Sequence, residues 1–230
     1  MTFTWNENTI RWYKNAGLYT GFYTALTRRL VPMLPPEESF CDMGCGLGLV
    51  DLNLAQHLHS ITCVDINASA IADLEAEIEK RGITTIHTVL GDCFEVPGPW
   101  HTIYLSFYAT RQLERFANRC QRLVVVVSGE SETQLFPNTR RTQHRDTIAD
   151  EVAYLESQHL PYQLSVEPME FGQPFQSLHD ARCFVETYDP GITAQERDAF
   201  LASRLVQTSI PCLPLFMPRE KPVGIFDIDV

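Results

Sequence analysis

The sequence contains no apolar run long enough to span a bilayer. Its longest uninterrupted apolar stretch covers residues 123–127, whereas a membrane helix needs roughly 20 apolar residues. No basic segment followed by the apolar core of a signal peptide is present either. We therefore expect a cytoplasmic protein without a membrane partner.

Paired cysteines are absent as well. The seven cysteines are an odd number and none belongs to a CxxC pair, which argues against a disulfide framework and a zinc ribbon. Cys41 and Cys45 match the first two ligands of a CxxxCxxC iron–sulfur motif, but Gly48 stands where the third cysteine belongs. We expect reduced, mostly buried thiols and no metal site.

Basic residues are scarce. The chain has 18 Lys and Arg against 29 Asp and Glu, a formal net charge of -11. Such a surface repels phosphate backbones, and nucleic-acid binding depends on neutralising several of those charges. Arg140, Arg141 and Arg145 form the main basic cluster, which is typical of a solvated helix face. We therefore expect a small-molecule partner and no nucleic acid, while the oligomeric state stays open.

Short apolar runs alternate with helical patterns from residue 40 to residue 127. This alternation is typical of parallel strands joined by crossover helices. The expected strands cover residues 39–43, 61–66, 84–90, 102–107 and 123–128. Asn67 and Gly82 are placed to begin and end one crossover helix, because asparagine caps helix N-termini and glycine takes the left-handed conformation that ends helices. These signals predict an α/β, doubly wound fold.

Both flanks of this unit carry further signals. Ser177 with Asp180, and Thr193 with Glu196, predict capping boxes of two later helices. Residues 212–217 and 223–228 flank a proline turn and predict a terminal hairpin, so that the sheet should finish antiparallel. Apolar side chains at helical spacing predict one N-terminal helix that stops near Pro32, marked by Tyr19, Phe22, Tyr23, Leu26 and Leu30.

The most informative segment is a strand that runs into a glycine-rich turn, Phe40-Cys41-Asp42-Met43-Gly44-Cys45-Gly46-Leu47-Gly48. Glycines are needed where a turn takes unusual dihedrals and where a ligand approaches bare backbone amides near a helix N-terminus. A dinucleotide fingerprint, GxGxxG, would require glycine at the position of Leu49. The spacing therefore weakens the case for a nicotinamide cofactor.

An acid followed by GxGxG resembles motif I of the class I S-adenosylmethionine-dependent methyltransferases, and the likeness covers about residues 10–128. The resemblance implies a Rossmann-like fold with a mainly parallel seven-stranded sheet and an antiparallel last strand. It also implies S-adenosylmethionine as the cofactor and methyl transfer as the activity. An acid beside the turn suits a cationic sulfonium better than a pyrophosphate.

The resemblance further implies a set of cofactor-binding residues. They are Asp42, Gly44, Cys45, Gly46 and Gly48 around the turn, Asp65 for the ribose hydroxyls, Ile66 over the adenine, Asp92 and Cys93 near the adenine amino group, Ser106 near the methionine moiety, and Tyr19 from the N-terminal helix. Each has an alternative interpretation: the aspartates stabilise turns, and the cysteines and aromatics pack in the core.

The segment after the fourth strand departs from part of the family. Ser106-Phe107-Tyr108-Ala109 stands where enzymes acting on adenine or peptide-like amino groups often carry Asn/Asp-Pro-Pro-Tyr/Phe, so that chemistry is not supported. Methyl transfer requires alignment and exclusion of water, and it requires a base only when the acceptor is protonated. Tyr108, Glu130 and His144 are the candidate bases.

We expect a single domain over residues 1–230. It comprises an N-terminal helical cap (1–35), a cofactor-binding core (36–130), an inserted lid (131–176) and a C-terminal part of the sheet with its helices (177–230). The predicted function is methyl transfer to an unidentified small molecule by in-line displacement, with specificity in the cap and the lid. The alternatives are a non-catalytic S-adenosylmethionine-binding sensor or accessory subunit, and an NAD-dependent oxidoreductase.

Overall fold

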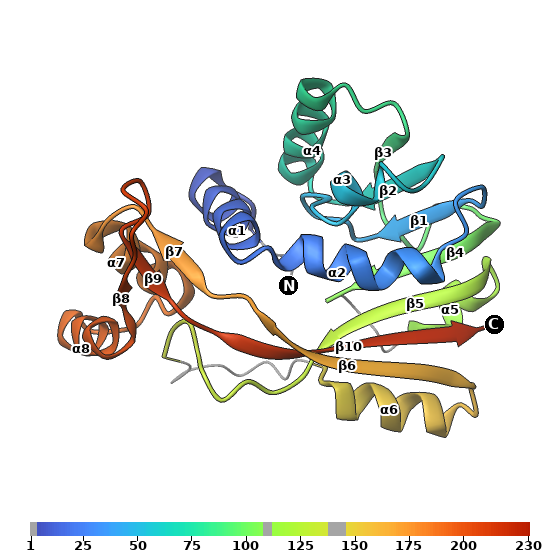
Figure 1. The fold of residues 1–230 in the computed structure, drawn as a ribbon. Coiled ribbons are helices and arrows are strands. Elements are labelled where there is room, and N and C mark those ends of the chain that lie inside the picture. The colour runs from blue at the N-terminus through green and yellow to red at the C-terminus, as the bar shows by residue number, and fades with distance from the viewer. Residues whose placement is uncertain (1–3, 108–111, 138–145) are drawn as a thin grey trace.

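The computed structural model describes residues 4–107, 112–137 and 146–230. A seven-stranded sheet with the order β3-β2-β1-β4-β5-β10-β6 forms its centre, and a three-stranded sheet with the order β7-β9-β8 lies at one end (Figure 1). The main strands are β1 (Phe40–Met43), β2 (Ile61–Asp65), β3 (Ile86–Leu90), β4 (Trp100–Ser106), β5 (Cys120–Ser128), β6 (Tyr162–Glu170) and β10 (Glu220–Asp229).

Five neighbouring strands of the main sheet are parallel. β3, β2, β1, β4 and β5 pair in parallel, whereas β10 pairs antiparallel with both β5 and β6. The predicted α/β fold with a mainly parallel sheet is therefore confirmed, together with the antiparallel last strand. All five predicted strands of the parallel part are present, within a few residues of their expected ends.

The predicted terminal hairpin is wrong. Residues 215–217 form β9 in the small sheet, and the chain then crosses to the main sheet, where β10 lies between β5 and β6. An alternating apolar pattern predicts that a segment is a strand, but it carries no information on distant partners. The partners of β10 come from 50 or more positions earlier, with Val223 opposite Ser128 and Glu167.

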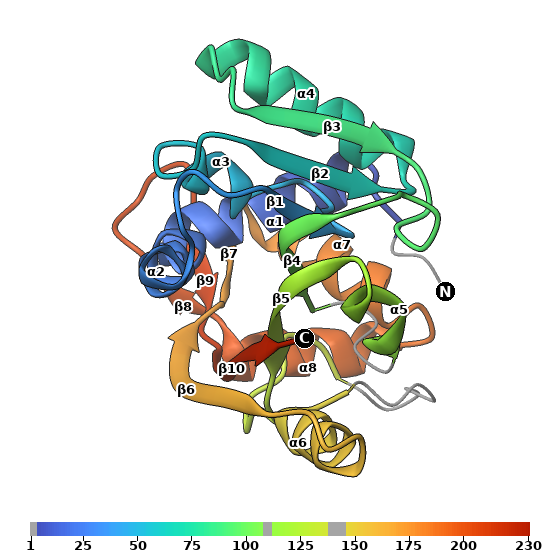
Figure 2. The same cartoon turned by 90° about the vertical axis from the view of Figure 1, so that its right-hand side faces the viewer.

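Helices cover both faces of the main sheet. Figure 2 shows α2 (Phe22–Leu30) and α3 (Asp51–Leu54) on one side, and α5 (Glu114–Ala117) and α6 (Ile148–Ser157) on the other. The crossover helix α4 (Ala68–Arg81) packs on β2 and β3. Alternation along β5 serves both layers, because Val124 and Val126 join the core under α2 while Val125 joins the core under α5 and α6. The inner strands of the main sheet are thus buried on both faces, whereas the edge strands β3 and β6 are partly exposed.

Local helix signals are mostly confirmed. Asn67 caps α4 by accepting from two backbone amides, and Gly82 ends that helix at φ 63°. Thr193 forms the predicted capping box with Glu196 at the start of α8 (Ala194–Arg204). The single N-terminal helix is wrong, because Gly21, at φ 67°, divides it into α1 (Glu7–Thr20) and α2.

An accessory lobe lies beyond the end of the main sheet to which β1 points (Figure 1). It consists of α1, α7 (Leu178–Tyr188), α8 and the small sheet of β7 (Gln173–Phe175), β8 (Val206–Gln207) and β9 (Leu215–Met217). Trp12 of α1 is buried there together with Phe175, Phe184 and Met217. Helix α1 therefore belongs to this lobe, although α2 packs on the sheet.

The structure divides the segment that was predicted to be a lid. Residues 148–157 form α6 and residues 162–170 form β6, an edge strand of the main sheet, whereas β7 begins the accessory lobe. That any of these segments closes over a ligand stays a prediction. Within the described ranges, no helix combines the length and apolar character that crossing a membrane requires.

Candidate functional site

The glycine-rich turn lies at the carboxyl end of β1. Gly44, Gly46 and Gly48 have φ values of 86°, 54° and 58°, in the left-handed region that side chains disfavour. β1 lies between β2 and β4. In the strand order, β2 and β3 follow on one side of β1, and β4 and β5 follow on the other. Open α/β sheets bind ligands outside the carboxyl ends of their strands at such a switch point. The turn therefore stands where this fold places a ligand.

The amides of the turn are not bare, and the prediction that they are is wrong. Gly44 and Cys45 donate to the Val64 carbonyl at 2.8 and 3.0 Å. Gly46 donates to Oδ2 of Asp65 at 2.8 Å, and Gly48 donates to the Cys45 carbonyl at 3.0 Å. These bonds hold the turn against the end of β2. A ligand would therefore find four of the five amides from Gly44 to Gly48 already bonded within the protein.

Two of the three glycines are also needed for close packing. A Cβ on Gly48 would lie 2.6 Å from Leu74 of α4, so this glycine lets the turn and the helix approach each other. A Cβ on Gly46 would lie 3.3 Å from the indole of Trp5. The half-buried Trp5 therefore covers one glycine of the turn from the N-terminal segment.

Asp65 ends β2 and is half-buried. Its Oδ1 accepts from the Asn67 amide at 2.8 Å, while Oδ2 accepts from Gly46. A carboxylate oxygen has two lone pairs, so each keeps acceptor capacity for a hydroxyl group. Both interpretations of Asp65 are therefore compatible with the geometry: it stabilises the turn, and its ribose role stays a prediction.

Two large apolar side chains are exposed at the same edge. Ile66, which follows β2, is 62% exposed, and Leu90, which ends β3, is 58% exposed. Ile66 directly follows Asp65, and Leu90 lies two residues before Asp92. Large apolar side chains left open beside carboxylates form a surface suited to a flat ring with polar edges. This surface agrees with the predicted position of an adenine.

The remaining predicted cofactor residues are spread along the edge. Oδ1 of Asp92 accepts from the Phe94 amide at 2.9 Å, as its interpretation as a turn residue requires, and Cys93 is buried. Ser106 ends β4 and is half-buried. The ring of Tyr19 faces away from the turn toward Phe216 of the lobe, with ring centroids 4.6 Å apart. Their contacts with a cofactor stay predictions.

A pair of buried acids flanks the turn. Asp42 is 3% exposed and Asp51 is fully buried. Burial raises the pKa of Asp51 to about 6, while burial first and the neighbouring Asp51 second raise the pKa of Asp42 well above its usual range. Oδ1 of Asp42 and both oxygens of Asp51 accept nothing from the described donors. A proton shared between the two carboxyl groups satisfies this pair.

Asp51 was missed by sequence reasoning, although a signal for it exists. Leu47, Val50, Leu54 and Leu58 mark an apolar helical stripe, and position 51 lies on that stripe, four residues after Leu47. An acid on an apolar stripe is a buried charge unless it has a partner. Asp42, nine positions earlier, is that partner.

Helix α1 links the lobe to the core. Asp180 of α7 accepts from Arg11 at 2.7 Å and from the Trp12 indole at 2.8 Å, so the predicted Ser177–Asp180 capping box is only half formed. Lys14, on the next turn, binds Asp73 and Glu77 of α4 at 2.8 and 3.1 Å. The lobe is thereby tied to the helix that packs on the glycine turn.

Of the three candidate bases, Glu130 alone is among the described residues. Glu130 is exposed in the loop directly after β5, whereas Tyr108 and His144 lie outside the described residues, as do the three arginines of the basic cluster. The carboxyl edge also carries a buried lysine, Lys221, that sequence reasoning missed. It reaches the edge only because β10 pairs with β5, a contact across about 90 positions.

Comparison with known proteins identifies the central part of the chain. Residues 40–126 match the family model of a methyltransferase domain. The magnesium protoporphyrin IX methyltransferase of Synechocystis PCC 6803, solved with bound S-adenosylmethionine, has the same fold with a TM-score of 0.53 at 13% identity, over 98% of this chain and 86% of that one. The family match over residues 40–126, together with the fold and the glycine turn, supports the predicted resemblance to the class I, S-adenosylmethionine-dependent methyltransferases.

Two curated relatives are RNA methyltransferases. The ribosomal RNA small subunit methyltransferase A of Kineococcus radiotolerans is 30% identical over 130 residues, which are 50% of this chain and 43% of that protein. An uncharacterized RNA methyltransferase of Enterococcus faecalis is 30% identical over 67 residues, 29% of this chain and 15% of that protein. The chain thus spans less than half the length of these relatives.

These relatives overturn the expectation that nucleic acid is excluded as a partner. A net charge of -11 describes the average surface. Binding of a phosphate depends on the local field in a cleft, which one buried cation can dominate. The average therefore does not decide between a nucleic acid and a small molecule.

Proposed function

We propose that this chain transfers a methyl group from S-adenosylmethionine to an acceptor bound between the carboxyl edge of the main sheet and the accessory lobe. One observation carries the proposal: the acid-flanked glycine turn, with Asp65 bonded to Gly46, lies at the switch point of the sheet. Its support is chemical, because carboxylates suit a cationic sulfonium and would repel a pyrophosphate.

The residues present fit this cofactor. Asp65 keeps free lone pairs for the ribose hydroxyls, Ile66 offers an apolar face to the adenine, and Gly46 leaves the turn without a side chain at φ 54°. When bound, the cofactor supplies a methyl carbon already made electrophilic by the sulfonium. The chain has to align the acceptor with that carbon and to exclude water.

The accessory lobe suits the second task. It stands beyond the carboxyl edge, and α1 fastens it to the core through Lys14 on one side and Asp180 on the other (Figure 1). An acceptor that enters between the lobe and the ends of β4 and β5 would lose its bulk solvent. A sensor that only retains the cofactor has no need of such a cover.

Binding of S-adenosylhomocysteine tests the cofactor half of the proposal. Trp5 lies against Gly46, so a ligand seated on the turn should change its fluorescence, and Trp5→Phe should remove the change. Asp65→Ala should weaken binding tenfold to about a hundredfold, since buried hydroxyl groups lose their acceptor, a cost of about 1–3 kcal/mol. The exposed Glu79→Ala on α4 is the matched control. Retention of NAD in place of S-adenosylhomocysteine would overturn the proposal.

Label transfer tests the activity and the acceptor class together. The chain is incubated with methyl-labelled S-adenosylmethionine and, in separate reactions, with total RNA and with a small-molecule extract. The RNA methyltransferases among its relatives support the first arm, and the structural likeness to a protoporphyrin methyltransferase supports the second. Label that requires Asp65 in either arm supports methyl transfer. Cofactor binding without label in both arms would favour the sensor.

A further inference from the structure

Lys221 is the second residue of β10, and it is only 6% exposed. Its ammonium lies over three phenylalanine rings, 3.9 Å from the ring centre of Phe107 and 4.8 Å from those of Phe22 and Phe171. It also donates to the Ser128 hydroxyl at 3.3 Å. We call Lys221 with these three rings the lysine cage.

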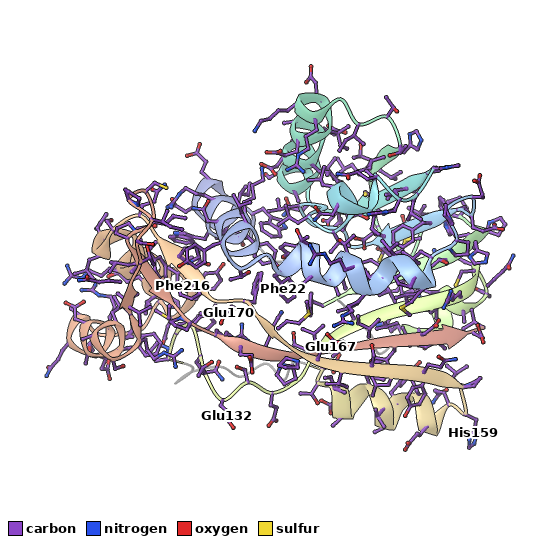
Figure 3. The ribbon with its side chains drawn as sticks, in the orientation of Figure 1. Phe22, Glu132, His159, Glu167, Glu170 and Phe216 are labelled. Atoms are coloured by element: carbon purple, nitrogen blue, oxygen red, sulfur yellow. The ribbon has the colours of Figure 1, made fainter. Side chains whose placement is uncertain are left out.

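The side chains around the Lys221 ammonium come from four segments besides β10. Phe107 follows β4, Phe22 begins α2, Phe171 follows β6, and Ser128 ends β5. Figure 3 shows Phe22 at the end of α2 that faces the accessory lobe. The cage therefore lies at the carboxyl edge of β4 and β5, beside Ser106 and away from the acidic residues of the glycine turn.

A buried ammonium group is costly unless its surroundings compensate it. The ring faces and the Ser128 hydroxyl are among the partners that return that cost, at roughly 0.5–2 kcal/mol for a cation over an aromatic ring. Phe107 adds a cost of its own, because its φ of 55° is unusual for a residue with a Cβ. A packing role alone would be served as well by leucine or methionine. The arrangement instead keeps a positive charge at a defined place.

The residues beside the cage are partly exposed at the carboxyl edge. Phe107 is 36% exposed, and Ser106 and Ser128 are both half-buried, whereas Lys221 itself is 6% exposed. The family match ends at residue 126, well before Lys221. This lysine is therefore a feature of the part of the chain that the methyltransferase domain model does not cover.

We propose that Lys221 binds an oxyanion of the methyl acceptor, a carboxylate or a phosphate, and so orients the acceptor at the carboxyl edge of β4 and β5. The inference rests on the proposed function, because this edge faces an acceptor only if the cofactor occupies the glycine turn. A charge-assisted bond from a partly desolvated ammonium is strong and short, which makes Lys221 a determinant of specificity. The lysine itself forms no covalent bond in this role.

The test uses the whole chain saturated with S-adenosylhomocysteine. Benzoate, phenyl phosphate, neutral benzamide and the diribonucleotide UpU are titrated and followed by ligand-observed NMR. At least one anion should bind ten or more times more tightly than benzamide. Tighter binding of UpU would assign the oxyanion to an RNA phosphodiester, and tighter binding of phenyl phosphate or benzoate would assign it to a small acceptor; either result supports the proposal.

Substitutions locate the bound anion. Lys221→Met should weaken the preferred anion at least tenfold and leave benzamide unchanged, and Lys221→Arg should retain the anion within about threefold. Arg29→Met is the matched control, because Arg29 lines a neighbouring groove of about 190 Å³ between α2 and β6, which shares Phe22 with the cage, and pairs there with Glu167 at 2.6 Å (Figure 3). The Lys221→Met variant should fold, because methionine suits a site lined by phenylalanine rings.

The outcomes separate the inference from the proposed function. Equal anion binding by wild type and Lys221→Met, or no preference for anions over benzamide, would refute the anion-binding role of Lys221, even where S-adenosylhomocysteine binds. Failure of wild type to bind S-adenosylhomocysteine would refute the proposed function first. If Lys221→Met is poorly folded, Ser128→Ala gives the second reading: it should weaken the anion two- to fivefold, and an unchanged affinity would count against the proposal.

Discussion

The two halves of the carboxyl edge differ in charge. Asp65 ends β2 and Asp92 follows β3, whereas the ends of β4 and β5 meet the buried ammonium of Lys221. We call them the acidic half and the cationic half. A sulfonium suits the first, and an oxyanion suits the second. Under the proposed function, the cofactor and the acceptor would meet at this edge, where an in-line displacement requires them to be aligned.

The two halves also differ in how they are built. The acidic half comes from residues 42–92, close together along the chain, and coincides with the family match. The cationic half combines residues from position 22 to position 221 and depends on β10 reaching the centre of the sheet. The family match thus covers the acidic half, whereas Lys221, Phe22 and Phe171 of the cationic half lie outside it.

Gly48→Ala should cause the largest change, by breaking the acidic half at its turn. The new Cβ would lie 2.6 Å from Leu74 at a φ of 58°, so strain and overpacking add to about 3 kcal/mol of lost stability. Gly82→Ala is the matched control, because Gly82 has φ 63° but open space around it, and it should cost about 1 kcal/mol. Urea unfolding measures both. Equal losses would show that Gly48 serves the backbone alone.

A crossed comparison of Asp65→Ala and Lys221→Met should show that the halves act separately. Asp65→Ala should weaken binding of S-adenosylhomocysteine tenfold to about a hundredfold and leave the affinity for the preferred anion unchanged. Lys221→Met should weaken binding of that anion and leave the affinity for S-adenosylhomocysteine unchanged. The double variant should show the sum of the two free-energy changes within about 0.5 kcal/mol. Coupling well above that value would mean that the edge is one continuous site.

The acidic half could be predicted from sequence to a large extent, and the cationic half could not. The glycine turn, Asp65 and the cap at Asn67 are local signals within 26 residues of chain, and the structure brings them together. Lys221 has no such signal. Residues 223–228, just after it, were predicted to form a hairpin with residues 212–217, which would have placed Lys221 in the turn between them. Only strand partners, which a single sequence does not specify, bring it to Phe107.

Sequence reasoning also misjudged the turn in one physical respect. Glycines at unusual dihedrals were taken to expose bare amides, yet each described amide of Gly44, Cys45, Gly46 and Gly48 has an acceptor within the protein. Buried or half-buried amides need partners with or without a ligand. A pattern of glycines predicts the conformation of a loop, but the side chain that satisfies the loop, here Asp65, is known only from the structure.

The pH dependence of stability should depend on the buried pair in the acidic half. Burial raises the pKa of Asp51 from 3.8 to about 6, so the folded state holds its proton more tightly than the unfolded chain does. Stability from this group is complete below about pH 4 and is lost as the pH rises through about 6, a change on the order of 3 kcal/mol. Asp51→Asn should flatten this fall, whereas the exposed Asp229→Asn should not. Urea unfolding between pH 4 and pH 7 measures it, and an unchanged slope in Asp51→Asn would contradict the shared proton.

Lys14→Met should have the smallest effect, and it tests whether the lobe, through α1, keeps the acidic half and the cationic half aligned. Lys14 joins α1 to Asp73 and Glu77 at 2.8 and 3.1 Å, and its proximity contributes to lowering the pKa of Glu77, against a raising effect of burial. The groups are partly exposed, so the pair should contribute only about 0.5–1 kcal/mol and weaken at high salt. Asp180→Asn removes the other fastening of α1 and should cost more, because Asp180 is 8% exposed and bonds both Arg11 and Trp12. If α1 aligns the halves, Lys14→Met lowers methyl transfer while both ligands still bind separately with unchanged affinity; a fall in either binding affinity instead would place Lys14 with the cofactor or the acceptor itself.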